Sequence, residues 1–262
     1  TDGTITGDTE NGSGVGISGN STLTNTTVNG NTSGNGYGVG ISGNSTLTGN
    51  SSVSGNATGG NGTGVDINGN LSGGTVTGNA TGNGTGVDIS GNITDGTITG
   101  DTENGSGVGI SGNSTLTNTT VNGNTSGNGT GVDINGNLSG GTVTGNATGN
   151  GTGGDISGNI TDGTITGDTE NGSGVGISGN STLTNTTVNG NTSGNGYGVG
   201  ISGNSTLTGN SSVSGNATGG NGTGVDINGN LSGGTVTGNA TGNGTGVDIS
   251  GNITDGTITG DT

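Results

Sequence analysis

The chain lacks every residue type that carries a positive side-chain charge, and every thiol. Its 262 residues contain no Lys, Arg, His, Cys, Met, Trp, Phe or Pro. This absence removes imidazole bases, thiolate nucleophiles, Schiff-base lysines, soft metal ligands and disulfides. We therefore expect no enzymatic activity and no tightly bound cofactor.

The charge of the chain has one sign only. Its 17 Asp and Glu residues give a formal net charge of −17. A chain without cations cannot neutralise phosphates, so we expect neither nucleic acid nor an anionic membrane surface as a partner. No apolar run approaches the roughly 18 residues of a membrane-spanning helix, so membrane insertion is not expected. The chain begins at Thr1 rather than Met, and we expect it to be a segment of a longer protein.

Hydrophobic residues make up 19% of the chain and aromatic residues 1%. This composition alone is typical of a disordered spacer, but a regular Val-x-Ile motif argues against disorder. Repeats of 20 to 50 residues are typical of solenoids. The Val of the motif stands at positions 15, 39, 65, 87, 108, 132, 175, 199, 225 and 247, with Gly154 in the same slot between 132 and 175.

Each repeat contains its apolar residues in one order. Val15 and Ile17 alternate with a Gly, Leu23 centres "STLTN" and Val28 centres "TTVNG", and Gly-Asn and Gly-Asp corners separate these segments. Period-two segments joined by such corners predict short strands and tight turns. The sequence thus predicts an all-β, right-handed parallel β-helix, one domain over 1–262, with three short strands per coil, 21–26 residues per coil and about eleven coils. The predicted inward ladders are Val15/Val39/Val65/Val87, Ile17/Ile41/Ile67/Ile89, Leu23/Leu47/Leu71/Ile93 and Val28/Val53/Val76/Ile98, continued downstream.

Three near-identical super-repeats, 1–93, 94–160 and 161–262, test this unit. The middle copy lacks the 26 residues at 37–62 of the first copy, which is the length of one coil. A β-helix can lose a whole coil and pair its neighbours again in phase. The middle copy also has Gly154 where the first has Val87, which predicts local loosening of that coil, because apolar burial is lost.

Aspartates recur in one slot of consecutive coils, where stacked carboxylates repel each other. Two interpretations are open: water solvates them on an exposed face, or a hard cation such as Ca²⁺ binds between them. The Ca²⁺ candidates are Asp66, Asp88, Asp133, Asp155, Asp226 and Asp248.

Threonine pairs flank inward residues at 22–24, 46–48, 75–77 and 97–99. Paired outward hydroxyls could form the flat array of an ice-binding solenoid. Against this, the same slots elsewhere hold Asn29, Ser52, Ser54 and Asn70, so ordinary Thr and Ser ladders that stabilise a sheet are the alternative.

Asn-x-Ser/Thr sequons are dense along the chain. They are N-glycosylation acceptors where a glycosyltransferase can reach them, although Asn at a corner needs no sugar. The glycosylation candidates are Asn20, Asn25, Asn44, Asn56, Asn70, Asn79 and Asn92.

The segment "GVDISGNITDGTITGDTENGSGVGISGNSTLTNTTVNGN" resembles the repeat region of two-partner-secretion exoproteins of the filamentous haemagglutinin type, particularly their Asn-rich glycosylated adhesins. The resemblance covers essentially the whole chain. It implies a β-helical shaft, export through an outer-membrane two-partner transporter, glycosylation at sequons such as Asn20 and Asn79, and attachment to host-cell surface glycans or proteins at the surface of a Gram-negative bacterium.

Overall fold

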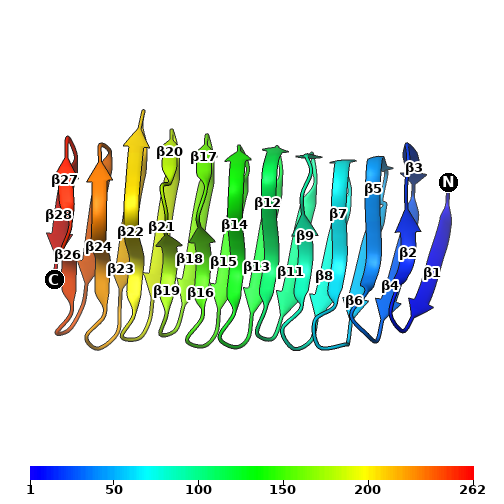
Figure 1. Cartoon of the computed structure of the whole chain (residues 1–262), viewed down its shortest axis with the longest axis horizontal. Coiled ribbons are helices and arrows are strands. Elements are labelled where there is room, and N and C mark those ends of the chain that lie inside the picture. The colour runs from blue at the N-terminus through cyan, green and yellow to red at the C-terminus, as the bar shows by residue number, and fades with distance from the viewer.

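The computed structural model describes all 262 residues and is built from strands and turns, without any helix. It therefore has no helix of the length and apolarity that crossing a membrane requires. Successive coils stack along the longest axis, with the N- and C-termini at opposite ends (Figure 1). Every strand pairing is parallel and joins one coil to the next, so the predicted parallel β-solenoid of about eleven turns is confirmed.

One sheet, named sheet A here, contains the strands centred on the last Val or Ile of each coil, in which Val, Gly and Thr or Ala alternate inward with outward polar residues. Its twelve strands are β1 (Gly3–Thr9), β4 (Thr26–Thr32), β6 (Ser52–Ala57), β8 (Thr75–Ala80), β11 (Thr97–Thr102), β13 (Thr120–Thr125), β15 (Thr142–Ala147), β18 (Thr164–Thr169), β21 (Thr187–Thr192), β23 (Ser212–Ala217), β25 (Thr235–Ala240) and β28 (Thr257–Asp261).

The other sheet, sheet B, contains both remaining apolar segments of each coil. The three predicted segments per coil therefore lie in two sheets, because the Val-x-Ile and Leu segments run on as one bent strand in six coils and as two strands in the other five. Its strands are β2 (Ser13–Ile17), β3 (Ser21–Thr24), β5 (Tyr37–Thr48), β7 (Thr63–Ser72), β9 (Thr85–Ile89), β10 (Ile93–Thr94), β12 (Ser106–Thr117), β14 (Thr130–Ser139), β16 (Thr152–Ile156), β17 (Asn159–Thr161), β19 (Ser173–Ile177), β20 (Thr182–Thr184), β22 (Tyr197–Thr208), β24 (Thr223–Ser232), β26 (Thr245–Ile249) and β27 (Asn252–Thr254).

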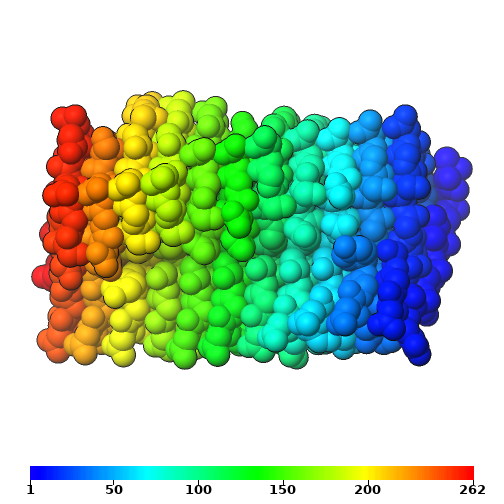
Figure 2. All heavy atoms as spheres, viewed as in Figure 1, coloured from blue at the N-terminus to red at the C-terminus, as the bar shows by residue number.

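The core is a single cluster of 38 buried residues between the two sheets. The predicted Val and Ile ladders are confirmed residue by residue: Val39 pairs with Val65, Ile41 with Ile67 and Val53 with Val76. Each coil supplies only a few aliphatic side chains, so no coil can be stable without its neighbours. Figure 2 shows the coils as adjoining bands along the whole length.

The predicted Leu ladder is wrong at one step, because Leu47 and Leu71 do not pair. Leu23 pairs with Leu47, whereas Leu71 pairs with Ser45, two residues before Leu47. Coils with the longer Val-to-Leu spacing therefore place two residues inward, Ser45 and Leu47 in β5. Gly74 of the next coil, at φ 79°, leaves room for the side chain of Leu47, because a Cβ on Gly74 would lie 2.5 Å from Cδ1 of Leu47. The Gly-Gly pair in "LSGGTV" is thus explained by the Leu of the preceding coil.

The middle super-repeat confirms the coil as the unit of deletion. Its β12 corresponds to β2 and β3 of the first copy, and it pairs directly with β14, which corresponds to β7. Val108 still meets Val132 and Ile110 still meets Ile134. Loss of 26 residues therefore removes one layer of the stack and leaves both ladders in phase.

Gly154 leaves the backbone ladder of its coil unbroken, since it pairs with Val132 on one side and Val175 on the other. What is lost is side-chain packing. A Cβ at Gly154 would lie 3.7 Å from Cγ2 of Ile165 and 3.9 Å from Cγ2 of Val175, which is ordinary van der Waals contact. The position can therefore accept the Val found in the other copies, and the expected loosening remains a prediction about side-chain mobility.

Restoring the missing side chain should stabilise the solenoid. We expect Gly154→Val to raise the free energy of unfolding by about 1.5–3 kcal/mol through apolar burial and by a further ~0.5–1 kcal/mol through backbone entropy. Guanidinium denaturation followed by circular dichroism measures this. Gly145→Ala is the matched control: its Cβ would collide with the carbonyl oxygen of Gly153, so it should lower the midpoint. An unchanged midpoint for Gly154→Val would contradict the packing argument.

Candidate functional site: the outer faces of the two sheets

The outer face of sheet B contains one position per coil, between the inward Val and Ile, that is occupied by Asp or Gly. We name it the aspartate row. In coil order it holds Gly16, Gly40, Asp66, Asp88, Gly109, Asp133, Asp155, Gly176, Gly200, Asp226 and Asp248. The six predicted aspartates are thus brought together as three directly stacked pairs, separated by one or two glycines.

Five of the six carboxyl groups are partly buried, and burial raises the pKa of Asp66, Asp88, Asp133, Asp155 and Asp226 above the ordinary value of 3.8. Neighbouring carboxylates raise it further: Asp88 acts on the pKa of Asp66, and Asp248 on that of Asp226. No basic side chain exists in the chain to offset this repulsion. The row is therefore a line of carboxylates that lack a partner cation.

The stacked pairs do not form a calcium site by themselves. Nowhere in the chain do three or more acidic side chains come close enough to hold one metal ion. Ca²⁺ needs six to eight oxygen ligands, and a carboxylate pair supplies only part of that set.

A row of asparagines on the outer face of sheet A was not predicted from the sequence. In this row Nδ2 of each Asn donates to Oδ1 of the equivalent residue one coil earlier: Asn31 to Asp8 (2.7 Å), Asn56 to Asn31 (2.8 Å) and Asn79 to Asn56 (2.9 Å). The pattern restarts after Asp101 and again after Asp168. Its sequence signal is an Asn or Asp three residues after the last apolar residue of each coil.

A second asparagine row follows the bend of sheet B. Nδ2 of Asn70 donates to Oδ1 of Asn44 (2.8 Å), and Asn92 donates to Asn70 (3.0 Å). Asn25, at φ 48° on a corner, donates to Asp2 (3.0 Å).

These bonds bear on the glycosylation candidates, because a sugar would be attached to Nδ2. Among the seven, Asn25, Asn56, Asn70, Asn79 and Asn92 use that atom in hydrogen bonds within the chain. Asn20 and Asn44 are exposed and do not donate to another side chain.

The threonine pairs lie on two different faces. Those at 22–24 and 46–48 belong to β3 and β5 of sheet B, whereas those at 75–77 and 97–99 belong to β8 and β11 of sheet A. They therefore do not form one array. Sheet A does carry a full column of hydroxyls: its outward position before the last apolar residue is Thr or Ser in every coil, as in Thr27, Ser52 and Thr75.

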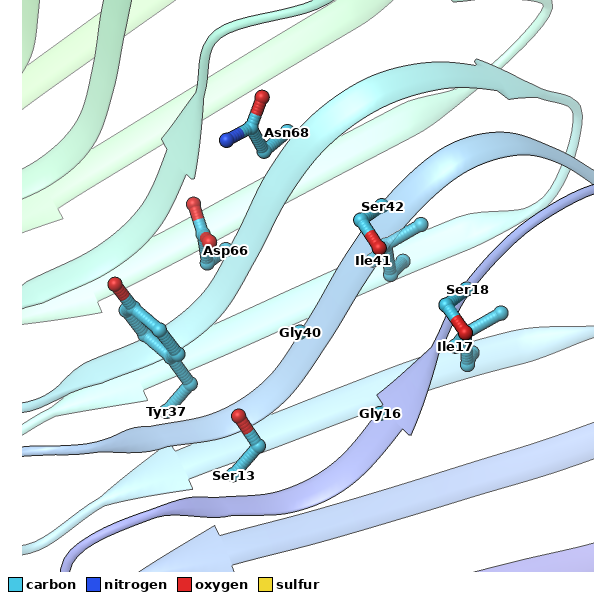
Figure 3. A pocket seen from close by; sticks show the side chains of 10 residues that line it. All are labelled: Ser13, Gly16, Ile17, Ser18, Tyr37, Gly40, Ile41, Ser42, Asp66 and Asn68. Atoms are coloured by element: carbon cyan, nitrogen blue, oxygen red, sulfur yellow. The ribbon is translucent and has the colours of Figure 1, made fainter.

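Glycines in the aspartate row open hollows in the outer face of sheet B. One, the Tyr37 groove, has a volume of about 290 Å³, with Gly16 and Gly40 at its floor and Tyr37, Asp66 and Asn68 among its lining residues. Figure 3 shows Tyr37 and Asp66 side by side at one end of it. The other tyrosine, Tyr197, lines a second groove, the Tyr197 groove.

The Tyr197 groove has a volume of about 260 Å³ and lies at the equivalent place in the third super-repeat. Gly176 and Gly200 stand between its two carboxylates, Asp155 and Asp226. A Cβ on Gly176 would lie 3.2 Å from Oδ1 of Asp155, so this carboxylate leans over the groove. Tyr37 and Tyr197 are the first residues of the equivalent strands β5 and β22.

Comparison with known proteins adds no identification: neither a protein-family model, nor a curated protein, nor a solved structure matches the chain.

The raised pKa values predict stabilisation by mild acid. Folded-state pKa values above that of unfolded Asp mean that the folded chain binds protons more tightly between pH 3.8 and the raised values. The protonated aspartates of the row therefore contribute fully to the stability of the fold below this pH window, and this contribution is lost as pH rises through the window. We therefore expect the Tm to increase as pH falls from 7 into this window, as thermal scans monitored by circular dichroism would show.

A charge-matched pair of variants isolates the row from general charge repulsion. One triple variant removes a carboxylate from each stacked pair: Asp66→Asn, Asp133→Asn and Asp226→Asn. It should have a higher Tm at pH 7 and a flatter dependence of Tm on pH. Asp95→Asn with Asp162→Asn and Asp255→Asn removes the same charge at exposed corners near φ +55°, a conformation that Asn also adopts in this chain. Equal profiles for the two triple variants would show that the row has no special role.

Proposed function

We propose that the chain is a non-enzymatic structural shaft of a secreted or surface-displayed bacterial adhesin, which mediates attachment to host cells or matrix. One observation carries the proposal: twelve strands of sheet A and eleven coils of sheet B continue as parallel ladders along a single axis. At about 4.8 Å per coil the stack is roughly 50 Å long. Because whole coils can be lost in phase, as in the middle super-repeat, the length of such a shaft is adjustable.

The resemblance to two-partner-secretion exoproteins supports the cellular part of the proposal. It implies export through an outer-membrane transporter and modification by a glycosyltransferase, with Asn20 and Asn44 as the candidates whose Nδ2 is free of side-chain partners. The polar, cysteine-free chain is compatible with passage through a narrow pore, because no disulfide has to form before export.

The shaft is tested by its length. Insertion of a second copy of 1–160 after residue 160 adds seven coils, and we expect small-angle scattering to show a rod longer by roughly 34 Å at unchanged cross-section. A control with the inserted residues in scrambled order should not extend the rod. A compact or disordered particle for the duplicated chain would contradict the proposal.

Attachment is tested separately with beads coated with this chain, and with the scrambled chain as control, on cultured epithelial cells. Greater retention of beads coated with this chain supports adhesion. Equal retention removes the adhesive role and leaves the shaft intact.

Ice binding is a second candidate, favoured by the hydroxyl column of sheet A. Seven of its twelve strands carry a full Thr-x-Thr pair: 4/6, 75/77, 97/99, 142/144, 164/166, 235/237 and 257/259.

The ice-binding candidate predicts thermal hysteresis that is lost when one central side chain breaks the flat face. Thr97→Lys interrupts the column in β11, whereas Thr22→Lys on sheet B leaves it intact and serves as control. Nanolitre osmometry of the purified chain measures the effect. Absence of hysteresis in the unmodified chain rejects this candidate.

A further inference from the structure

The two aromatic side chains of the chain lie outside the core, on the surface of sheet B. Tyr37 and Tyr197 are each 42% exposed, and each lines a groove in the outer face of sheet B. Ser13 and Ser173 occupy the same slot in the adjacent coils, so the strand ladder does not require an aromatic residue there. Large aromatic side chains normally contribute by burial, and an exposed ring over a hollow suits a ligand instead.

The chemistry of both grooves is anionic. Asp66 borders the Tyr37 groove, and the Tyr197 groove has a carboxylate on either side, Asp155 and Asp226. These carboxyl groups are partly withdrawn from water, and other carboxylates are their nearest charged neighbours along the row. A cation entering a groove would relieve that repulsion, and the ring beside it would add a cation–π contact.

The glycines make the ring and the carboxylate reachable together. A Cβ on Gly200 would lie 3.9 Å from Cδ2 of Tyr197, so the ring stands directly beside the glycine floor. Any larger residue at Gly176 or Gly200 would fill the space between Asp155 and Asp226. The grooves therefore exist because glycine interrupts the aspartate row at the coils that carry tyrosine.

We propose that the Tyr37 and Tyr197 grooves bind arginine or lysine side chains of a basic segment of a partner protein. The grooves lie on the same face, seven coils and thus roughly 34 Å apart. An extended segment of about ten residues spans that distance, so two basic residues of one partner could engage both grooves and gain avidity. The net charge of −17 would also accelerate the encounter with such a segment.

This inference names the partner chemistry for the attachment role proposed above and rests on that role. The rod itself does not depend on it, so the scattering experiment and the binding experiment can fail independently.

Tyrosine fluorescence of the full chain reads the grooves directly, because the chain contains no Trp and only these two Tyr. The probe is Nα-acetyl-arginine methyl ester, and the control is Nα-acetyl-citrulline methyl ester, which has the same shape but no charge. We expect a saturable change in emission with the arginine ester that weakens as sodium chloride is added. The citrulline ester should produce no saturable change.

Two double variants assign the effect to the carboxylates of the grooves. Asp66→Asn with Asp226→Asn should weaken the apparent affinity about tenfold, whereas Asp95→Asn with Asp162→Asn removes equal charge at corners outside the grooves and should leave it unchanged. Both retain both tyrosines, and circular dichroism confirms that they fold. An equal loss in both double variants would reduce the effect to net charge and overturn the proposal.

Single-groove variants sharpen the test. Tyr37→Ser leaves the Tyr197 groove as the sole reporter and Tyr197→Ser leaves the Tyr37 groove, each with a residue that the adjacent coil already carries in that slot. The Tyr197 groove should bind the arginine ester several-fold more tightly, because it has a second carboxylate. An equal response to the citrulline ester would show that the positive charge of the side chain is not recognised, and would overturn the proposal. Saturation by a methyl glycoside or by calcium chloride, without saturation by the arginine ester, would show that the grooves bind a different class of ligand and would also overturn it.

Discussion

The parallel, in-register hydrogen bonding between consecutive coils is the constraint on which the structure depends. Outside the Leu slot of sheet B, each strand pairs with the next coil at the equivalent residue, so equivalent side chains stack about 4.8 Å apart along the axis. A side chain in one slot must therefore be able to pack against the same kind of side chain in the coil before it and in the coil after it. This requirement limits the residue types in each slot more than the needs of any single coil do.

Each kind of side chain answers this requirement differently. Stacked Val and Ile gain from it, because neighbours bury each other and a thin core becomes continuous. Stacked Asn gain as well, since an amide is both donor and acceptor and can bond to its own copy. Stacked Asp destabilise the fold, because two neighbouring carboxylates repel each other. The glycines that interrupt the aspartate row limit this repulsion and open the grooves.

The sequence predicted the solenoid, its coil length and most of its inward ladders, because apolar spacing is a direct record of which side chains share a face. It did not predict that the Val-x-Ile and Leu segments form one sheet, since a bend between two segments has no apolar signature. The register shift between Leu47 and Leu71 was likewise hidden, because it depends on room left by Gly73 and Gly74 in the next coil. Sequence reasoning located the Asp stack but not the grooves beside Tyr37 and Tyr197, which appear only when neighbouring coils are placed together.

The asparagine row of sheet A has a direction. In every bond Nδ2 points toward the N-terminal coil and the carbonyl oxygen toward the C-terminal one, so the amide dipoles of a run add up as peptide dipoles do in a helix. Asp8, Asp101 and Asp168 each receive the first N–H of a run, at its positive end. The super-repeat is therefore also an electrical unit: each carboxylate caps one line of aligned amides, and the next carboxylate interrupts that line before another begins.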